Sequence, residues 1–147
     1  METTLINHLL KTKTSRDYIT MDYAIVKAFH HKSQGRQKIW AVATDNKNNI
    51  IAEAGNHYKE THPLQQHYAL LCGCAYRNTL HAEINLFVKL KRLRKSCDKI
   101  FIARSDYLQR PMLAKPCEIC GTAIREHMLQ HHVKKVYWTL DRKEMPK

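Results

Sequence analysis

The pattern of hydrophobic and polar positions, together with one proline, predicts helices in three segments of the chain. Residues 15–31 carry four of them at intervals of four, three and three positions, the period of a helix with one buried face: Ile19, Tyr23, Val26 and Phe29. A second helix is predicted to begin at His81 and to end in the cationic run of residues 89–95. A third is predicted over residues 117–129, directly after Pro116, because proline is common at the start of helices.

Short apolar runs of strand-forming residues predict four strands. Residues 39–44 and 50–54 flank an Asn-rich turn and predict a β-hairpin. Residues 99–105 and 133–140 are predicted as the third and fourth strands. The polar segment 57–66 contains Pro63 and is predicted to be irregular, with helical pieces from about Tyr68 onward.

The order of these elements is helix, strand, strand, helix, strand, helix, strand, which predicts an α/β fold, a three-layer α/β/α sandwich. The mixed sheet would contain about four strands, and the last two would run parallel because a helix crosses between them. A weak amphipathic pattern over residues 1–14 predicts an accessory helix, and residues 15–147 are expected to form one domain.

The charge balance favours anionic ligands. The chain has 147 residues, with 25 Lys plus Arg and 13 Asp plus Glu, and a formal net charge of +12. This excess suits partners ranging from a nucleotide monophosphate to a strand of nucleic acid. No apolar run approaches the roughly 18 residues of a membrane-spanning helix, so no membrane partner is expected. Five cysteines in a chain of this length favour reduced thiols and a cytoplasmic location.

Two short motifs carry the candidate chemistry, namely residues 81–83 (His-Ala-Glu) and residues 116–120 (Pro-Cys-Glu-Ile-Cys). Cys117 and Cys120 are three positions apart, so both sulfurs lie on the same side of one helical turn. With His81 they would form a Cys₂His set for Zn²⁺ that leaves the fourth tetrahedral position for water. Glu83 is then better explained as a proton shuttle than as another ligand.

A structural zinc site is the alternative explanation, with Cys72 or Cys74 as a fourth ligand. It gives no role to Glu83, and these two cysteines are more simply explained as small buried side chains. Cys97 is expected to be unreactive. The pairs His30–His31 and His131–His132 are expected to be surface residues near helix ends.

The two motifs resemble those of the cytidine deaminase superfamily, and the order of elements matches it over roughly residues 18–140. The resemblance implies zinc ligands at His81, Cys117 and Cys120, with Glu83 as the general acid and base. It also implies that Asn56 contacts the sugar or base of the substrate and that the backbone of Ala82 contacts the base. Asn56 could equally be a simple turn residue. Members of the superfamily usually assemble, so a homo-oligomer is expected.

The chain also resembles small deaminase-like proteins of bacteriophages, which would place it in a host cytoplasm. It departs from common deoxycytidylate deaminases because residues 77–80 lack an additional His/Cys cluster. It departs from tRNA adenosine deaminases because Lys115 stands where they tend to have Glu. Because only a short polar segment follows the fourth predicted strand, the further strand and helix of many members are expected to be absent.

The expected activity is hydrolytic deamination of cytosine in a free nucleoside or nucleotide. Cytosine within single-stranded DNA or RNA is the alternative substrate, followed by adenine in tRNA, and a noncatalytic zinc module that binds nucleic acid is the alternative class. Cations that flank the motifs are candidates for phosphate contacts, and two tyrosines could stack on a base: Lys59, His62 and Lys115, with Tyr58 or Tyr107. The run at residues 89–95 lies too far along its helix to bind phosphate beside the metal.

Overall fold

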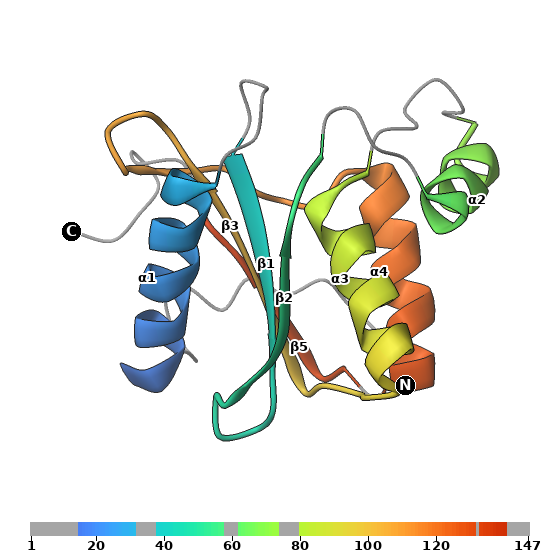
Figure 1. The fold of residues 1–147 in the computed structure, drawn as a ribbon, viewed down its shortest axis with the longest axis horizontal. Helices are drawn as coiled ribbons and strands as arrows, with labels where there is room; N and C mark the ends of the chain where they lie inside the picture. The colour runs from blue at the N-terminus through green and yellow to red at the C-terminus, as the bar shows by residue number, and fades with distance from the viewer. Residues whose placement is uncertain (1–14, 32–37, 58–61, 74–79, 132, 141–147) are drawn as a thin grey trace.

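The protein folds into three layers, with a sheet between two layers of helices (Figure 1). The computed structural model describes residues 15–31, 38–57, 62–73, 80–131 and 133–140. Helix α1 (Ser15–His30) covers one face of the sheet, and α3 (Ala82–Leu93) and α4 (Glu118–His131) cover the other. Helix α2 (Pro63–Leu71) packs on α4 and α3 at the outer side of that second layer. The predicted accessory helix in residues 1–14 lies outside the described residues.

The sheet contains five strands: β1 (Lys38–Thr44), β2 (Ile50–Gly55), β3 (Lys99–Ser105), β4 (Pro111–Met112) and β5 (Lys135–Trp138). Strand β1 lies between β2 and β3 and is antiparallel to both, so the predicted hairpin is confirmed. Strand β5 is parallel to β3, as the helical crossover between them predicts. The two-residue strand β4 pairs with the end of β3 and was not predicted, which raises the number of strands from about four to five.

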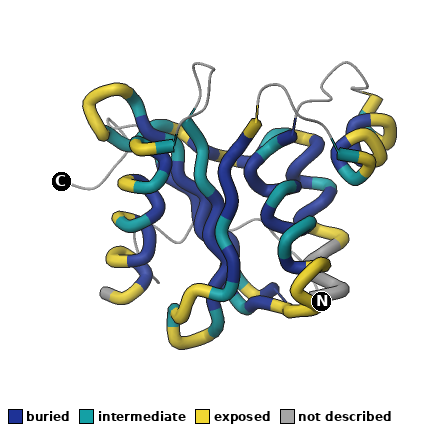
Figure 2. Tube along the Cα trace, viewed as in Figure 1, coloured by how far each residue is buried: buried dark blue, intermediate teal, exposed yellow. Residues whose placement is uncertain are grey.

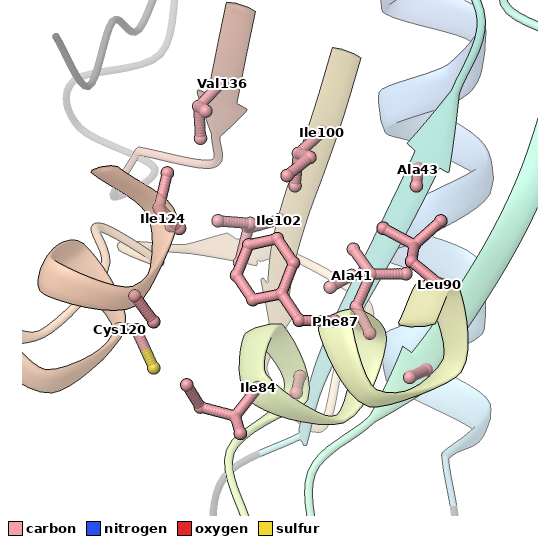
Figure 3. Packing of buried hydrophobic residues seen from close by; sticks show 14 of the residues in the cluster. Ala41, Ala43, Ile84, Phe87, Leu90, Ile100, Ile102, Cys120, Ile124 and Val136 are labelled. Atoms are coloured by element: carbon pink, nitrogen blue, oxygen red, sulfur yellow. The ribbon is translucent and has the colours of Figure 1, made fainter. Parts of the chain in front are cut away.

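Alternating side chains of β3 separate the core into two parts. Ile100 and Ile102 face α3 and α4, while Phe101 and Ala103 belong to the cluster under α1. Figure 3 shows Phe87 of α3 close to Ile102. Figure 2 shows the strands largely buried, with the exposed positions on the outer sides of the helices and in turns. Because both faces are covered, β3 is almost continuously apolar.

Several helix boundaries differ from the prediction, most of them by one or two residues. The segment predicted to be irregular contains the start of α2, where Pro63 occupies the first turn and His62 caps the helix by accepting a hydrogen bond from the Leu64 amide at 3.0 Å. Proline is well suited to this position because its missing N–H would have no partner inside the helix. Helix α4 begins at Glu118, one residue later than predicted. No described helix has the length and apolar character needed to cross a membrane.

A buried polar group joins three elements at the end of the sheet that carries the β1–β2 turn. The ammonium group of Lys99 on β3 lies 2.9 Å from the carboxylate of Asp17 on α1, and the side chains are only 8% and 1% exposed. Asn48, in the turn, accepts a hydrogen bond from Lys99 and donates one to Asp17, both at 2.9 Å. The backbone of Asn48 has φ 64°, a conformation that asparagine tolerates better than most residues.

Candidate functional site

Three of the predicted ligand side chains meet between α3 and α4. His81 is the cap residue of α3, Cys117 directly precedes α4, and Cys120 lies in its first turn. The Nδ1 atom of His81 lies 3.2 Å from Sγ of Cys120 and 3.5 Å from Sγ of Cys117. All three donor atoms lie within 4.8 Å of one another. The two motifs, separated by an entire strand and loop, therefore form one cluster.

The donor set fits zinc. With Zn–S near 2.3 Å and Zn–N near 2.05 Å, tetrahedral geometry places N and S about 3.5 Å apart, close to both observed separations. Within the described part of the chain the cluster contains these three donors and no fourth. Cys72 lies elsewhere, with its Sγ 3.4 Å from the hydroxyl of Thr122 and 3.6 Å from the carbonyl of Glu118. Cys74 lies outside the described residues.

The surroundings of the cluster shift the pKa values of three acidic groups. Hydrogen bonds from Cys120 and His81 lower the pKa of Cys117 to about 4. Burial raises the pKa of Cys120, and the neighbouring Cys117 and Glu83 add to the rise because a second negative charge there is unfavourable. Burial also raises the pKa of Glu83, whose side chain is 6% exposed. A divalent cation among the donors would compensate the charge of both thiolates.

A cavity of about 260 Å³ opens beside this cluster, at the end of the sheet opposite the β1–β2 turn. It is lined by five residues that the sequence analysis identified: His81, Glu83, Cys117, Asn56 and Lys115. Residues that the sequence analysis did not identify also line it, among them Ile39, His57 and Arg104. The cavity therefore combines a cluster of metal donors, a buried carboxyl group and two cationic side chains.

Asn56 is buried at the end of β2 and is held from several sides. Its side-chain oxygen accepts a hydrogen bond from the backbone N–H of Ile39 at 3.2 Å, and its backbone N–H donates to the Ile39 carbonyl at 3.4 Å. The Asn56 carbonyl lies 2.7 Å from Nε2 of His31. His31 was expected at the surface, but it is half-buried and packs edge-on against Trp40 with 5.4 Å between ring centroids. Asn56 is thus a fixed part of the cavity wall.

The other predicted substrate contacts are placed differently. Ala82 is fully buried as the first residue of α3, between the cluster residue His81 and Glu83. Lys115 is exposed at the cavity, whereas His62 borders a separate depression together with Lys91 and Arg92. Tyr107 is 78% exposed in the loop between β3 and β4. Lys59 and Tyr58 lie outside the described residues.

The sequence did contain a signal for Arg104. It is the only charged residue among the central residues 100–104 of β3, and alternation places it on the same face as Ile100 and Ile102. A cation at an inward-facing position of a buried strand indicates either a buried partner or a ligand. That position would have marked Arg104 before the structure was known.

Comparison with known proteins agrees with this geometry. The family model described as "Cytidine and deoxycytidylate deaminase zinc-binding region" matches residues 14–139. The search of curated proteins found no significant match. Among solved structures, the dCMP deaminase of the cyanophage S-TIM5, solved in apo form, is similar, with a TM-score of 0.55 and 22% sequence identity. The match covers 89% of this chain and 87% of the phage protein, and shows that the two share a fold.

The family match spans both motifs and all five strands. It also includes the three donors, which lie together beside a cavity that His81 and Cys117 line. The chain therefore belongs to the cytidine and deoxycytidylate deaminase family, whose zinc-binding region it contains.

Proposed function

We propose that the protein is a zinc-dependent enzyme that hydrolyses cytosine in a nucleoside or nucleotide to uracil and ammonia. The observation that carries this proposal is the position of Glu83, a buried carboxyl group that lines the same cavity as His81 and Cys117, two of the three metal donors. A purely structural zinc site would need no carboxyl group beside it. Membership of a deaminase family supports the reaction class.

In the proposed mechanism, zinc would activate the water and the side chain of Glu83 would transfer protons. His81, Cys117 and Cys120 would hold zinc, which acidifies water and thereby supplies a nucleophile near neutral pH. Glu83 would accept a proton from the attacking water and deliver it to N3 of the ring as C4 is attacked. Glu83 would then take the remaining proton of that water from the hydroxyl now on C4 and transfer it to the amino group, which leaves as ammonia as the C4 carbonyl forms. One water is consumed for each cytosine converted.

The chain's other cavity residues would position the ring. Asn56 is fixed by its contacts with Ile39 and His31, so its side chain would orient the sugar or the base at little entropic cost. The backbone of Ala82 would contact the base from the start of α3. Lys115, at the rim, would contribute positive charge towards the polar part of the substrate.

A polynucleotide substrate is the second candidate, favoured by the net charge of +12. The two substrates differ in their response to salt, because a polynucleotide releases counterions from many phosphates when it binds. Activity on single-stranded DNA or RNA would fall steeply with ionic strength, whereas activity on a free nucleotide would fall much less.

The proposal is tested by replacing Glu83 and, separately, a metal donor. Glu83→Gln should retain one zinc per chain by elemental analysis and lower kcat for ammonia release by at least about 100-fold. Cys120→Ser should instead lose the metal. Glu126→Gln, which removes a carboxylate from the exposed side of α4, is the matched control and should keep both zinc and turnover.

The assay should compare cytidine, deoxycytidine, their monophosphates, single-stranded DNA and RNA. Turnover of Glu83→Gln at the wild-type rate would exclude Glu83 as the proton shuttle. Full zinc content in Cys120→Ser, and likewise in Cys117→Ser, would exclude the ligand assignment.

A further inference from the structure

Arg104 has no partner inside the described part of the protein, although it lies in the central sheet. Its guanidinium group makes no hydrogen bond or ion pair with another described residue, and the side chain is half-buried in the cavity wall. Its backbone is engaged, since Arg104 pairs with Ile39 and Met112 in the sheet and its amide donates to the hydroxyl of Thr139 at 3.1 Å. Because this half-buried side chain lines the cavity without a partner among the described residues, its positive charge is available to a ligand bound there.

The register of the sheet places Arg104 relative to the substrate-facing residues. Arg104 on β3 pairs with Ile39 on β1, and Ile39 exchanges hydrogen bonds with Asn56 at the end of β2. Alternation along each strand puts all three side chains on the face covered by α3 and α4. They therefore form one row across the sheet, with Asn56 and Arg104 two strand spacings apart, or about 10 Å.

The charges around the cavity are suited to an anion. Arg104 and Lys115 contribute two positive charges, and Lys115 likewise makes no hydrogen bond or ion pair with the described residues. Glu83 is the one carboxylate among the lining residues, and it lies at the donor cluster. If zinc balances the two thiolates, the positive charges of Arg104 and Lys115 still exceed the negative charge of Glu83 in the rest of the cavity.

We propose that Arg104 is the specificity residue that binds a phosphate group of the substrate, so that the cavity prefers a phosphorylated cytosine nucleoside to the nucleoside itself. This inference rests on the proposed deaminase function. The planar guanidinium group matches two phosphate oxygens. In the row across the sheet, the apolar Ile39 lies between Arg104 and Asn56, and a sugar bound over it would connect a base near Asn56 with a phosphate near Arg104. Lys115 adds a second, less directional positive charge at the rim.

The test compares substrates with and without the phosphate in the zinc-loaded enzyme. Arg104→Met removes the charge while keeping a long side chain, and it should raise KM for deoxycytidine monophosphate by about 10- to 100-fold. KM for deoxycytidine should change by less than about threefold, so the preference for the monophosphate collapses. KM of Arg104→Lys for the monophosphate should lie between those of the wild type and Arg104→Met, because lysine keeps the charge and loses the planar guanidinium group.

Arg125→Met is the matched control, since Arg125 is exposed on α4 and does not line the cavity. It makes the same change in net charge and should leave both KM values as in the wild type. Circular dichroism and the thermal midpoint would establish that each variant is folded. An equal rise in KM for nucleoside and monophosphate, or no rise for either, would overturn the assignment of Arg104.

A second measurement separates this inference from the proposed function. If wild-type protein releases no ammonia from any cytosine compound, the proposed function fails, and the role of Arg104 is then judged by calorimetric binding of the same two compounds. Tighter binding of the monophosphate that is lost in Arg104→Met supports the phosphate contact. Equal binding of both compounds to wild-type protein contradicts it.

The phosphate could belong to a free nucleotide or to the backbone of a strand. A short single-stranded oligodeoxynucleotide containing one cytosine distinguishes them, because its binding falls steeply with salt and Arg104→Met would reduce the slope of log K against log salt by about one. A free monophosphate shows a much smaller salt dependence. Either pattern identifies the source of the phosphate, and a strand whose affinity is unchanged in Arg104→Met excludes the backbone.

Discussion

At the scale of single residues, the wall of the cavity depends on close packing between Gly55 and His31. A Cβ atom at Gly55 would lie 2.6 Å from two atoms of the His31 ring, closer than packed atoms approach. The same ring contacts the carbonyl of Asn56, the next residue along the chain. Gly55 is thus needed because an adjacent side chain occupies the space, and displacing that side chain would disturb Asn56.

Gly55→Ala should therefore destabilise the protein by about 1–3 kcal/mol, the usual cost of overpacking a well-filled site. The free energy of unfolding from urea titration measures this. His31→Ala should make room for the new methyl group, so the double variant His31→Ala/Gly55→Ala should lose less stability than the two single losses added together. Strictly additive losses would show that the two residues do not clash.

Gly73→Ala provides the comparison. Gly73 has φ 70° with nothing within 4 Å of the added Cβ, so its cost arises from the backbone alone, at about 1–2 kcal/mol. The His31→Ala change should give no relief there.

At the scale of elements, the ion pair between Asp17 and Lys99 fixes α1 onto β3, and Asn48 ties the β1–β2 turn to both. A buried ion pair adds little to folding stability compared with apolar residues of the same shape. Removing one partner is nevertheless destabilising, because it leaves a buried charge without compensation. The group therefore determines how α1 and the hairpin are oriented on the sheet, at the end opposite the cavity.

Lys99→Met should destabilise the protein by about 3–5 kcal/mol because the carboxylate of Asp17 remains buried. Urea unfolding measures the loss. The double variant Asp17→Asn/Lys99→Met removes both charges and should recover part of the stability that Lys99→Met loses. A double variant less stable than Lys99→Met alone would contradict the view that the uncompensated charge causes the loss.

The elements that could be predicted from sequence are those with a strong period. The helical spacing of Ile19, Tyr23 and Val26 identified the position of α1, and the Asn-rich turn identified the hairpin. The predicted buried face of α1 was wrong, because Ile19 is 68% exposed and Val26 38% exposed, and the helix packs on the sheet through other residues: Met21, Ala24, Ile25 and Ala28. The first part of α2 was missed because its start depends on capping by His62 rather than on a periodic pattern. Strand β4 was missed because two residues contain no period, and its pairing depends on the end of β3.

In the candidate site too, the residues found from sequence are those in local motifs, and the residue that was missed depends on the tertiary structure. Short-range chemistry in the sequence was sufficient to select His81, Glu83, Cys117 and Cys120. Alternation along β3 marks Arg104 as an inward-facing cation, but it was missed because only the register across the sheet brings it beside Ile39 and Asn56. His62 was selected for its closeness to the motifs in sequence, yet α2 carries it to a separate depression.

At the scale of the whole molecule, buried phenol groups make stability depend on alkaline pH. Burial raises the pKa of Tyr137 and Tyr68 to about 12 from an ordinary 10, and Asp17 contributes to the rise at Tyr137. Both side chains are at most 1% exposed. The unfolded chain loses these protons at lower pH than the folded protein, so their contribution to stability is complete below pH 10 and is lost as the pH rises towards 12.

The free energy of unfolding should accordingly fall between pH 10 and 12, by up to about 1.4 kcal/mol per pH unit for each of the two tyrosines. Urea unfolding at a series of pH values measures the slope. Tyr137→Phe should make the slope shallower by the amount for one group, and difference absorbance should show one fewer tyrosine titrating late. An unchanged slope in Tyr137→Phe would mean that this phenol ionises normally in the fold.

The β1–β2 pairing has an extra residue on β2, because Thr44 pairs with Ile50 while Ala43 pairs with Ala52. This bulge, far from the cavity, decides which face of the sheet every later residue of β2 occupies. Loss of a single residue there would turn Asn56 towards α1 while leaving each motif intact in the printed sequence. An insertion or deletion at this bulge would therefore abolish activity from the opposite end of the sheet, although no residue there lines the cavity.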